Sequence, residues 1–263
     1  GLGYYARARN LLKAAQMVMR EFAGVFPTTA SELQKLPGVG KSTAAAVASF
    51  CSGEPAAICD GNVKRVLSRV VVFDEPVDAA HGTQAIWGLA QELILAEAPG
   101  VFNQAMMDLG AMICTRTHPK CLLCPVSSFC RARALNAEER YPVKKPAREK
   151  EKRLLQLGLW MQNDSVVVIE RTQKDIWRGL WCLPELSQFC GIKLAASETL
   201  KMLQGSLIER FAHTLTHREL TIEIYRVKGP LKKGQPIRGL SSKDVESAPL
   251  PAPIKAFLLR QLQ

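Results

Sequence analysis

The chain has 263 residues, 47% of them hydrophobic, and a formal net charge of +11. This length allows two domains with cores of their own, and the apolar content excludes a disordered chain. The longest apolar stretches are far shorter than the roughly 18 residues of a membrane span, so we expect a soluble, cytoplasmic protein with no membrane partner. The positive charge favours a polyanionic partner such as nucleic acid, although charge alone is weak support for one.

Helical patterns dominate residues 1–113. No convincing run of strands occurs there, so we expect a mainly α region over residues 1–136. Periodic apolar positions with turn residues between them predict helices over Ala6–Phe22, Lys41–Ser52, Asn62–Val72, Thr83–Ala96 and Phe102–Ile113.

The pattern changes after a basic segment, residues 137–153. This segment holds seven basic and four acidic residues and two prolines, with little apolar content, and is predicted to be a solvated linker. Beyond it, Leu154–Met161, Val166–Ile169 and Glu219–Val227 have the pattern of strands, and Ser197–Gln204 is a candidate helix between them. Residues 154–263 are therefore expected to form an α+β domain.

Four of the eight cysteines lie close together in the sequence, as Cys114, Cys121, Cys124 and Cys130. Such a cluster indicates a metal site in a reducing compartment rather than disulfides. A compact loop lets each of four thiolates bond one iron of a cubane, so we expect a [4Fe–4S] cluster. Zinc is the alternative, but zinc usually takes its cysteines from two separated Cys-x2-4-Cys pairs, and this loop contains only one.

A second motif is the turn Gly38-Val39-Gly40, which opens directly into the helix expected from Lys41. Glycines let a backbone turn tightly and approach a ligand closely, while free N–H groups at a helix start suit an anion such as a DNA phosphate. A plain turn between two helices is the simpler alternative. The spacing of a P-loop is absent, and no strand precedes the turn as a dinucleotide fingerprint requires.

A third motif, Asp60-Gly61-Asn62, follows the glycine turn and stands at the start of the next expected helix. Seen alone, an acidic residue at this place is most often only the N-cap of the helix. Its position after the glycine turn raises the weight of a functional role.

The glycine turn, the aspartate and the cysteine loop, in this order, resemble the helix-hairpin-helix glycosylase superfamily. Within it the chain is most similar to the adenine DNA glycosylase (MutY-type) branch, through the segments 1–9, 60–67 and 102–110. The resemblance implies a monomeric base-excision repair enzyme that acts on double-stranded DNA. Such an enzyme flips out adenine mispaired with 8-oxoguanine or guanine and hydrolyses its glycosidic bond.

The resemblance also implies roles for individual residues. Asp60 would stabilise the oxocarbenium-like sugar, Asn62 would bond near the same centre, and Ser42 would line the pocket. Bifunctional members have a lysine at the position of Ser42, so a hydroxyl there favours monofunctional hydrolysis over an endonuclease III-like lyase. The expected DNA contacts are Tyr4, Gly38, Val39, Gly40, Lys41 and Lys64, with a core position for Tyr4 and a solvated one for Lys64 as the alternatives.

The family's general-acid glutamate lies well upstream of the Gly-Leu-Gly-Tyr-Tyr motif at which this sequence starts. We therefore expect the sequence to be a fragment of a longer protein. The alternative is a catalytically silent module that binds DNA lesions.

Residues 154–263 resemble the Nudix-like C-terminal domain of the same family, which recognises 8-oxoguanine. In place of the family's Phe-Ser-His loop this chain has Leu215-Thr216-His217, so Thr216 and His217 are the expected lesion contacts and Leu215 lacks the aromatic ring. The paired acids of the metal-binding Nudix box are absent, which favours binding over nucleotide hydrolysis. By itself, the spacing of His213 and His217 would suggest a structural or metal-binding pair.

Overall fold

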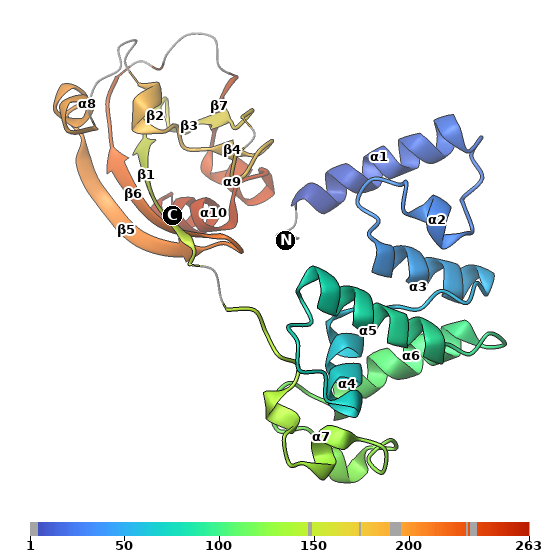
Figure 1. Ribbon diagram of the computed structural model, residues 1–263. Coiled ribbons are helices and arrows are strands. Elements are labelled where there is room, and N and C mark those ends of the chain that lie inside the picture. The colour runs from blue at the N-terminus through green and yellow to red at the C-terminus, as the bar shows by residue number, and fades with distance from the viewer. Residues whose placement is uncertain are drawn as a thin grey trace. The chain divides into compact units, whose positions relative to one another are not determined.

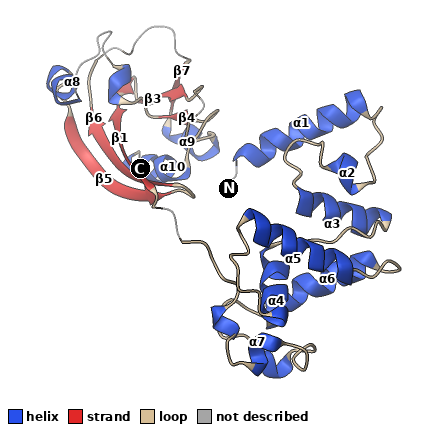
Figure 2. Cartoon of the chain, viewed as in Figure 1, coloured by secondary structure: helices blue, strands red, loops and turns tan. Residues whose placement is uncertain are grey.

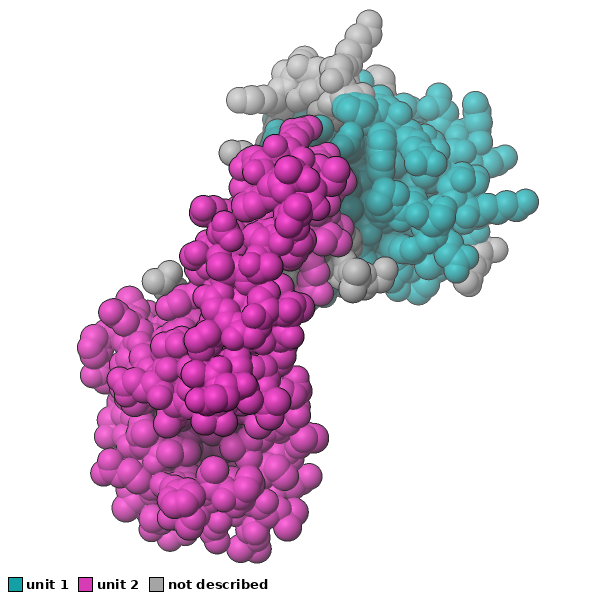
Figure 3. Space-filling model, turned by 90° about the vertical axis from the view of Figure 1, so that its right-hand side faces the viewer, with its two compact units in different colours: residues 1, 148–263 teal, residues 2–147 magenta. Residues whose placement is uncertain are grey.

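The computed structural model (Figure 1) describes residues 5–146, 149–173, 175–189, 196–229, 231 and 236–262. Helices make up the first part of the described chain, and strands and helices the second (Figure 2). The chain divides into two compact units, residues 2–147 and 148–263 (Figure 3). The prediction of a mainly α region followed by an α+β domain is therefore confirmed. Among the described residues, no helix is both long enough and apolar enough to span a membrane.

Two hydrophobic clusters join the long helices in the described part of the N-terminal unit. In the first, two residues of the first helix pack against one residue of the second and two small alanines of the third, which let the helices approach closely. The second cluster joins the fourth and fifth helices. The helices are α1 (Tyr5–Glu21), α2 (Ala30–Leu33), α3 (Lys41–Ser52), α4 (Gly61–Val71), α5 (Ala80–Leu93), α6 (Pro99–Asp108) and α7 (Arg131–Ala134), with short helical turns at Leu109–Ile113, Cys121–Leu123 and Glu138–Arg140.

Local signals explain several of these helix boundaries. Gly53 ends α3 in the left-handed conformation, with a φ of 69°, and its N–H donates to the carbonyl of Ala48. Pro99 occupies the first turn of α6, where a missing N–H leaves no hydrogen bond unmade. The five helices expected from the sequence are all present, with small shifts at their ends. The unexpected helices α2 and α7 have four residues each, too few for an apolar period to show.

The described strands of the C-terminal unit form two sheets. In the first, β6 lies between β1, to which it is parallel, and β5, to which it is antiparallel. In the second, β3 pairs antiparallel with β2, β4 and β7. The elements are β1 (Glu151–Leu159), β2 (Met161–Gln162), β3 (Ser165–Glu170), β4 (Trp181–Cys182), α8 (Ala196–Met202), β5 (Ser206–Thr214), β6 (Arg218–Arg226), β7 (Ile237–Leu240), α9 (Ser242–Ser247) and α10 (Ala252–Gln261), with a short helical turn at Leu186–Gln188.

Strands β1, β3 and β6 and helix α8 correspond to elements expected from the sequence. Strand β5 was not expected. Among the described strands it pairs with β6 alone, and its side chains are exposed or half-buried. It therefore lacks the buried apolar positions that identify β6.

The expected linker begins differently from the prediction. Instead of being solvated, Ala137 and Tyr141 are buried against Ala132. The hydroxyl group of Tyr141 donates to the carboxylate of Asp74 over 2.6 Å. The start of the segment thus packs within the N-terminal unit, while the proposed boundaries 1–136, 137–153 and 154–263 stay a prediction.

A network of charges joins strands of the C-terminal unit. The carboxylate of Asp175 accepts from Arg153 of β1 at 2.5 Å and from Arg218 of β6 at 2.7 Å. Arg171 binds Glu185 in the same network at 2.9 Å. Burial alone would raise the pKa of Asp175, but hydrogen bonds from Arg153, from a backbone N–H and from Arg218 lower it to about 2.

We expect Asp175→Asn to lower the free energy of unfolding of the C-terminal unit by about 1–2 kcal/mol at pH 7, because the folded state loses a carboxylate that it stabilises as the anion and solvent screens part of this effect. The pKa of Asp175 falls on folding, so the stabilisation is present above about pH 4 and disappears as the pH falls toward about 2. Urea unfolding at pH 7 and pH 3 measures both effects. Asp164→Asn, which changes an exposed carboxylate in the β2–β3 turn, is the control. Equal effects of the two substitutions would contradict the prediction.

Candidate functional site

The glycine turn joins α2 to α3 in a helical hairpin. The N–H of Val39 donates to the carbonyl of Leu36, and Gly38 between them has a φ of 82°. A Cβ atom on Gly38 would lie 2.7 Å from the Cβ of Asn10 in α1, so a larger residue does not fit. The turn is therefore fixed both by its backbone conformation and by close packing on α1.

Gly40 is the N-cap of α3, and its position leaves the start of the helix open. No side chain caps this end, and a Cβ atom on Gly40 would meet no atom within 4 Å. The open N–H groups and the positive end of the helix dipole suit an anion. At the same helix start, the ammonium of Lys41 lies 4.1 Å from the ring centroid of Trp87, a cation–π contact with α5.

Asp60 is the N-cap of α4. One carboxylate oxygen accepts from the backbone N–H groups of Asn62 and Val63, both at 2.9 Å. The other accepts from the side-chain amide of Asn62 at 3.2 Å. Asp60 is half-buried, so these bonds fix its carboxylate in one orientation without closing it off from solvent. Asp60 therefore caps the helix, as expected of an isolated aspartate. This capping is compatible with a chemical role, because the carboxylate is still accessible to solvent.

Ser42 and Asp60 are brought together because α3 binds the segment that leads to α4. The hydroxyl oxygen of Ser42 accepts from the N–H of Cys59, the residue before Asp60, at 3.2 Å. Burial raises the pKa of the Cys59 thiol to about 11, so this cysteine is a neutral core residue. The hairpin and the aspartate, which the sequence could only place in order, therefore form one site.

Asn103 of α6 supports the same segment, and sequence reasoning did not single it out within the motif 102–110. Its side chain is 1% exposed. Its amide oxygen accepts from the N–H of Ile58 at 3.0 Å, and its amide nitrogen donates to Ser49 and to the carbonyl of Ala56, both at 2.9 Å. Because a buried amide is destabilising unless bonded, these contacts define the path of the chain toward α4.

Arg65 links the aspartate to the cysteine loop. Its guanidinium donates to the side-chain oxygen of Asn62 at 2.8 Å and to the carbonyl of Gly110 at 2.6 Å. Its Nε donates to the carbonyl of Cys114 at 2.7 Å. A continuous chain of hydrogen bonds thus runs from Asp60 through Asn62 and Arg65 to the backbone of the first cysteine.

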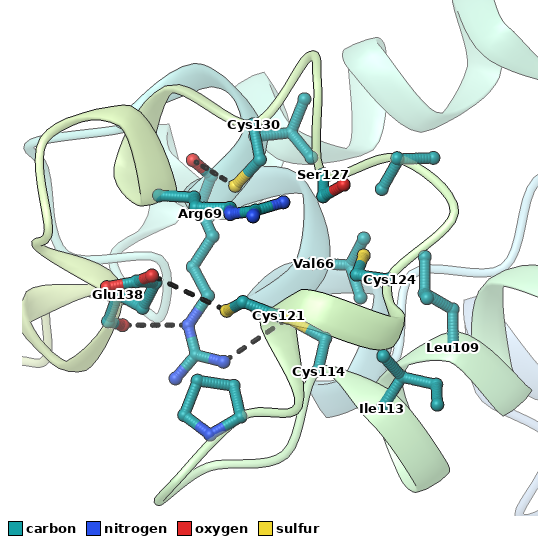
Figure 4. Close-up of a pocket in the computed structure, with 14 residues that line it drawn as sticks. Val66, Arg69, Leu109, Ile113, Cys114, Cys121, Cys124, Ser127, Cys130 and Glu138 are labelled. Carbon is teal, nitrogen blue, oxygen red and sulfur yellow. Dashed lines mark hydrogen bonds between the residues drawn. The ribbon is translucent and has the colours of Figure 1, made fainter.

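The four clustered cysteines line one pocket (Figure 4). Arg69, which is 1% exposed, donates to the sulfur of Cys114 at 3.2 Å. Cys121 donates to the carboxylate of Glu138 at 3.4 Å. Burial and this hydrogen bond raise the pKa of the Cys121 thiol to about 11. A metal bound there must therefore displace a proton from a thiol that the protein otherwise holds neutral.

The lining of the pocket is compatible with a metal held by thiolates. Its remaining walls include the apolar side chains of Val66, Leu109 and Ile113, which shield the thiols. Within the described ranges, no three His, Cys, Asp or Glu side chains are grouped tightly enough to hold one ion. Zinc would need all four sulfurs about 2.3 Å from one point, whereas a cubane accepts each thiolate on a different iron.

Tyr4 and Lys64 stand apart from the other expected DNA contacts. Tyr4 lies outside the described residues. The ammonium of Lys64 donates at 3.2 Å to the carbonyl of Val77, to Asp78 and to Thr83, so it points toward the start of α5. Its side chain is 16% exposed, so the alternative of a solvated lysine is wrong. Lys64 joins α4 to α5, and its DNA contact stays a prediction.

In the C-terminal unit, Leu215, Thr216 and His217 form the loop of the β5–β6 hairpin. The N–H of Leu215 donates to the carbonyl of Arg218 at 2.8 Å, and Thr216 and His217 are exposed. His213 instead packs on Trp177, with ring centroids 6.2 Å apart, and burial lowers its pKa. The two histidines therefore have different surroundings, and the hairpin loop presents Thr216 and His217 to solvent.

Comparisons with known proteins give matches in both units of the chain. A helix-hairpin-helix motif matches residues 21–50, and a NUDIX domain matches residues 156–260. Two adenine DNA glycosylases from Buchnera aphidicola, of Baizongia pistaciae and Schizaphis graminum, are 33% and 35% identical over 84% of this chain. The human adenine DNA glycosylase is 49% identical over 51% of the chain. The chain spans 63% and 65% of the length of the two bacterial relatives and 24% of the human one.

The capping role of Asp60 can be separated from any chemical role. We expect Asp60→Ala to lower the free energy of unfolding by about 1 kcal/mol, because two N–H groups of α4 lose their acceptor. Asp60→Asn retains a capping oxygen and should change stability by only a few tenths of that amount. Urea unfolding followed by circular dichroism measures the difference. An unchanged stability for Asp60→Ala would show that the cap contributes nothing.

Proposed function

We propose that the chain is a member of the adenine DNA glycosylase family, that it binds double-stranded DNA, and that it hydrolyses the glycosidic bond of adenine mispaired with 8-oxoguanine or guanine. The observation that supports this proposal is that Ser42, in the first turn of α3, accepts a hydrogen bond from the N–H of Cys59, the residue before Asp60, whose carboxylate caps α4. A DNA strand held at the hairpin would bring a flipped nucleotide within reach of that carboxylate. The C-terminal unit would read the opposite base.

The hairpin is suited to bind the DNA backbone. Gly38, Val39 and Gly40 leave the N–H groups at the start of α3 free of side-chain caps. A phosphate there would accept from these groups, and the ammonium of Lys41 would add positive charge. Such contacts position the duplex without reading its sequence.

Asp60 would stabilise the charge that develops on the sugar. As the bond between C1′ and the base breaks, its electron pair leaves with adenine and positive charge builds on the sugar. The negative charge of the oriented carboxylate stabilises this positive charge. Water then adds to C1′ to give free adenine and an abasic site. Asn62 holds the carboxylate in place, since its amide donates to Asp60.

A monofunctional reaction is the proposal that the neighbouring groups support. A lyase needs an amine that attacks C1′, and Ser42 supplies a hydroxyl instead. The ammonium of Lys64 is held by three oxygen acceptors on and near α5. Departure of adenine also requires a proton, and the resemblance assigns this to a glutamate upstream of the matched motifs.

A single-turnover assay on an A:8-oxoguanine duplex tests the proposal. We expect an N-terminally extended chain to release adenine and this chain to be slower by about 10²–10⁴-fold, the typical contribution of a general acid. Asp60→Asn should slow the extended chain by at least about 10²-fold while leaving its stability nearly unchanged. Duplex binding without adenine release by the extended chain would favour the lesion-binding module. A covalent adduct trapped by borohydride would favour the lyase.

We also propose that Cys114, Cys121, Cys124 and Cys130 hold a [4Fe–4S] cluster. The family relationship and the single pocket shared by the four thiols support this. The cluster would cross-link the loop and brace it against DNA rather than take part in base hydrolysis. A reducing compartment such as the cytoplasm would suit such a centre.

Purified protein should contain about four irons per chain and absorb visible light. Iron analysis and the visible spectrum measure this directly. Cys124→Ser should lower the iron content, whereas Cys51→Ser, which changes an exposed cysteine of α3, should not. Colourless protein with one zinc per chain would refute the cluster and support the alternative metal.

In the C-terminal unit, we propose that Thr216 and His217 contact the oxidised base. Their exposure at the tip of the β5–β6 hairpin supports this. The network around Asp175 includes Arg218, the residue directly after the loop, and so fixes the base of the hairpin. Leu215 is half-buried and offers no aromatic ring for stacking.

A further inference from the structure

The start of the segment that connects the two units is bound to the same arginine as the cysteine loop. The Nε of Arg69 donates to the carbonyls of Glu138 and Tyr141, at 2.8 and 3.0 Å. One of its terminal nitrogens donates to the sulfur of Cys114 at 3.2 Å and to the carbonyl of Thr115 at 2.7 Å. One buried guanidinium therefore binds the cysteine loop and the start of the connecting segment together (Figure 4).

Tyr141 is the main anchor of this segment. Its side chain is 5% exposed, and its hydroxyl group donates to Asp74 over 2.6 Å. Two residues later, the carbonyl of Val143 accepts from the N–H of Val77 at 3.2 Å. Directly after Val143, the side chain of Lys144 is exposed. The anchored part of the segment therefore ends at Val143.

The cysteine loop contacts the segment a second time, through the side chain of a glutamate. The backbone N–H of His118 donates to the carboxylate of Glu139 at 3.4 Å. The loop and the segment therefore contact each other and also the same arginine. A change in the conformation of one should change the conformation of the other.

We propose that Arg69 and Tyr141 form a latch through which the cysteine loop determines where the tether between the two units begins. With the latch closed, residues 144–150 connect the anchored segment to β1. With the latch open, the tether includes residues 138–150. The coupling to metal rests on the proposed cluster, whereas the latch itself rests on the contacts above.

Limited trypsin digestion of the full, metal-loaded chain tests the latch. Trypsin cleaves after Arg140 and Lys144, but a proline follows Lys145. The bond after Arg140 should be protected, because it leads into the buried Tyr141, while the bond after Lys144 should be cut readily. Mass spectrometry gives the rate at each bond, and the ratio of the two rates reports the latch.

Tyr141→Phe should raise the rate of cleavage after Arg140 by about tenfold without changing cleavage after Lys144, because it removes one hydrogen bond to a carboxylate and retains the ring. Tyr225→Phe is the matched control, since the Tyr225 hydroxyl donates to Glu223 at 2.7 Å in the other unit. Equal rates for Tyr141→Phe and the unaltered chain would overturn the latch. So would rapid cleavage after Arg140 in the unaltered, loaded chain.

Iron loss to a chelator tests whether the latch is coupled to metal binding by the cysteine loop. By reciprocity, if the closed latch favours the loaded loop, Tyr141→Phe should lose several times more iron than the Tyr225→Phe control at equilibrium with a chelator. Unchanged iron loss would overturn the coupling while leaving the latch in place. Protein that contains no metal would refute the proposed cluster and the coupling together, but the digestion would still decide the latch.

Discussion

The buried guanidinium of Arg69 is the constraint on which much of the N-terminal unit depends. A charge that is 1% exposed is tolerated only when its donors are satisfied. The donors of Arg69 reach two stretches of chain, the first cysteine with the residue after it and the segment that contains Glu138 and Tyr141. The loop and the following segment must therefore adopt a shape that presents carbonyl groups to α4. The cysteines line their pocket within that shape.

Helix α4 carries the polar groups of this arrangement along one face. Asn62, Arg65 and Arg69 are spaced by three and four residues, so they lie on the same side of the helix. Val63 and Leu67 belong to the hydrophobic core instead. The aspartate at the start of α4 and the cysteines beside its later turns are thus held by one rigid element. A disturbance of the loop has a direct path of hydrogen bonds to the proposed catalytic carboxylate.

The C-terminal unit uses charge differently. Its arginines and carboxylates pair mainly with each other, and Asp175 joins two strands that are parallel neighbours. This network includes the first residue of β6, directly after the hairpin loop, and keeps the base of the hairpin in place. The side chains at the tip, among them the half-buried Leu215, lie outside the network.

The sequence by itself determined the features that depend on local order. Apolar periodicity identified the long helices and strands β1, β3 and β6, while glycine and aspartate placement marked the hairpin turn and the cap of α4. Close spacing along the chain also identified the cysteine loop, because four thiols so near in sequence must lie near one another in space.

Only the tertiary structure showed how these motifs are joined. Arg65, Arg69 and Asn103 bind carbonyl and N–H groups that are distant in the sequence, and nearly every residue offers such groups, so no side-chain pattern reveals the partner. The same reason explains Tyr141, which the sequence assigned to a polar linker and which is buried because Arg69 and Asp74 bind it. The local sequence thus identifies the motifs of the site. Long-range hydrogen bonds to the backbone determine how these motifs are arranged.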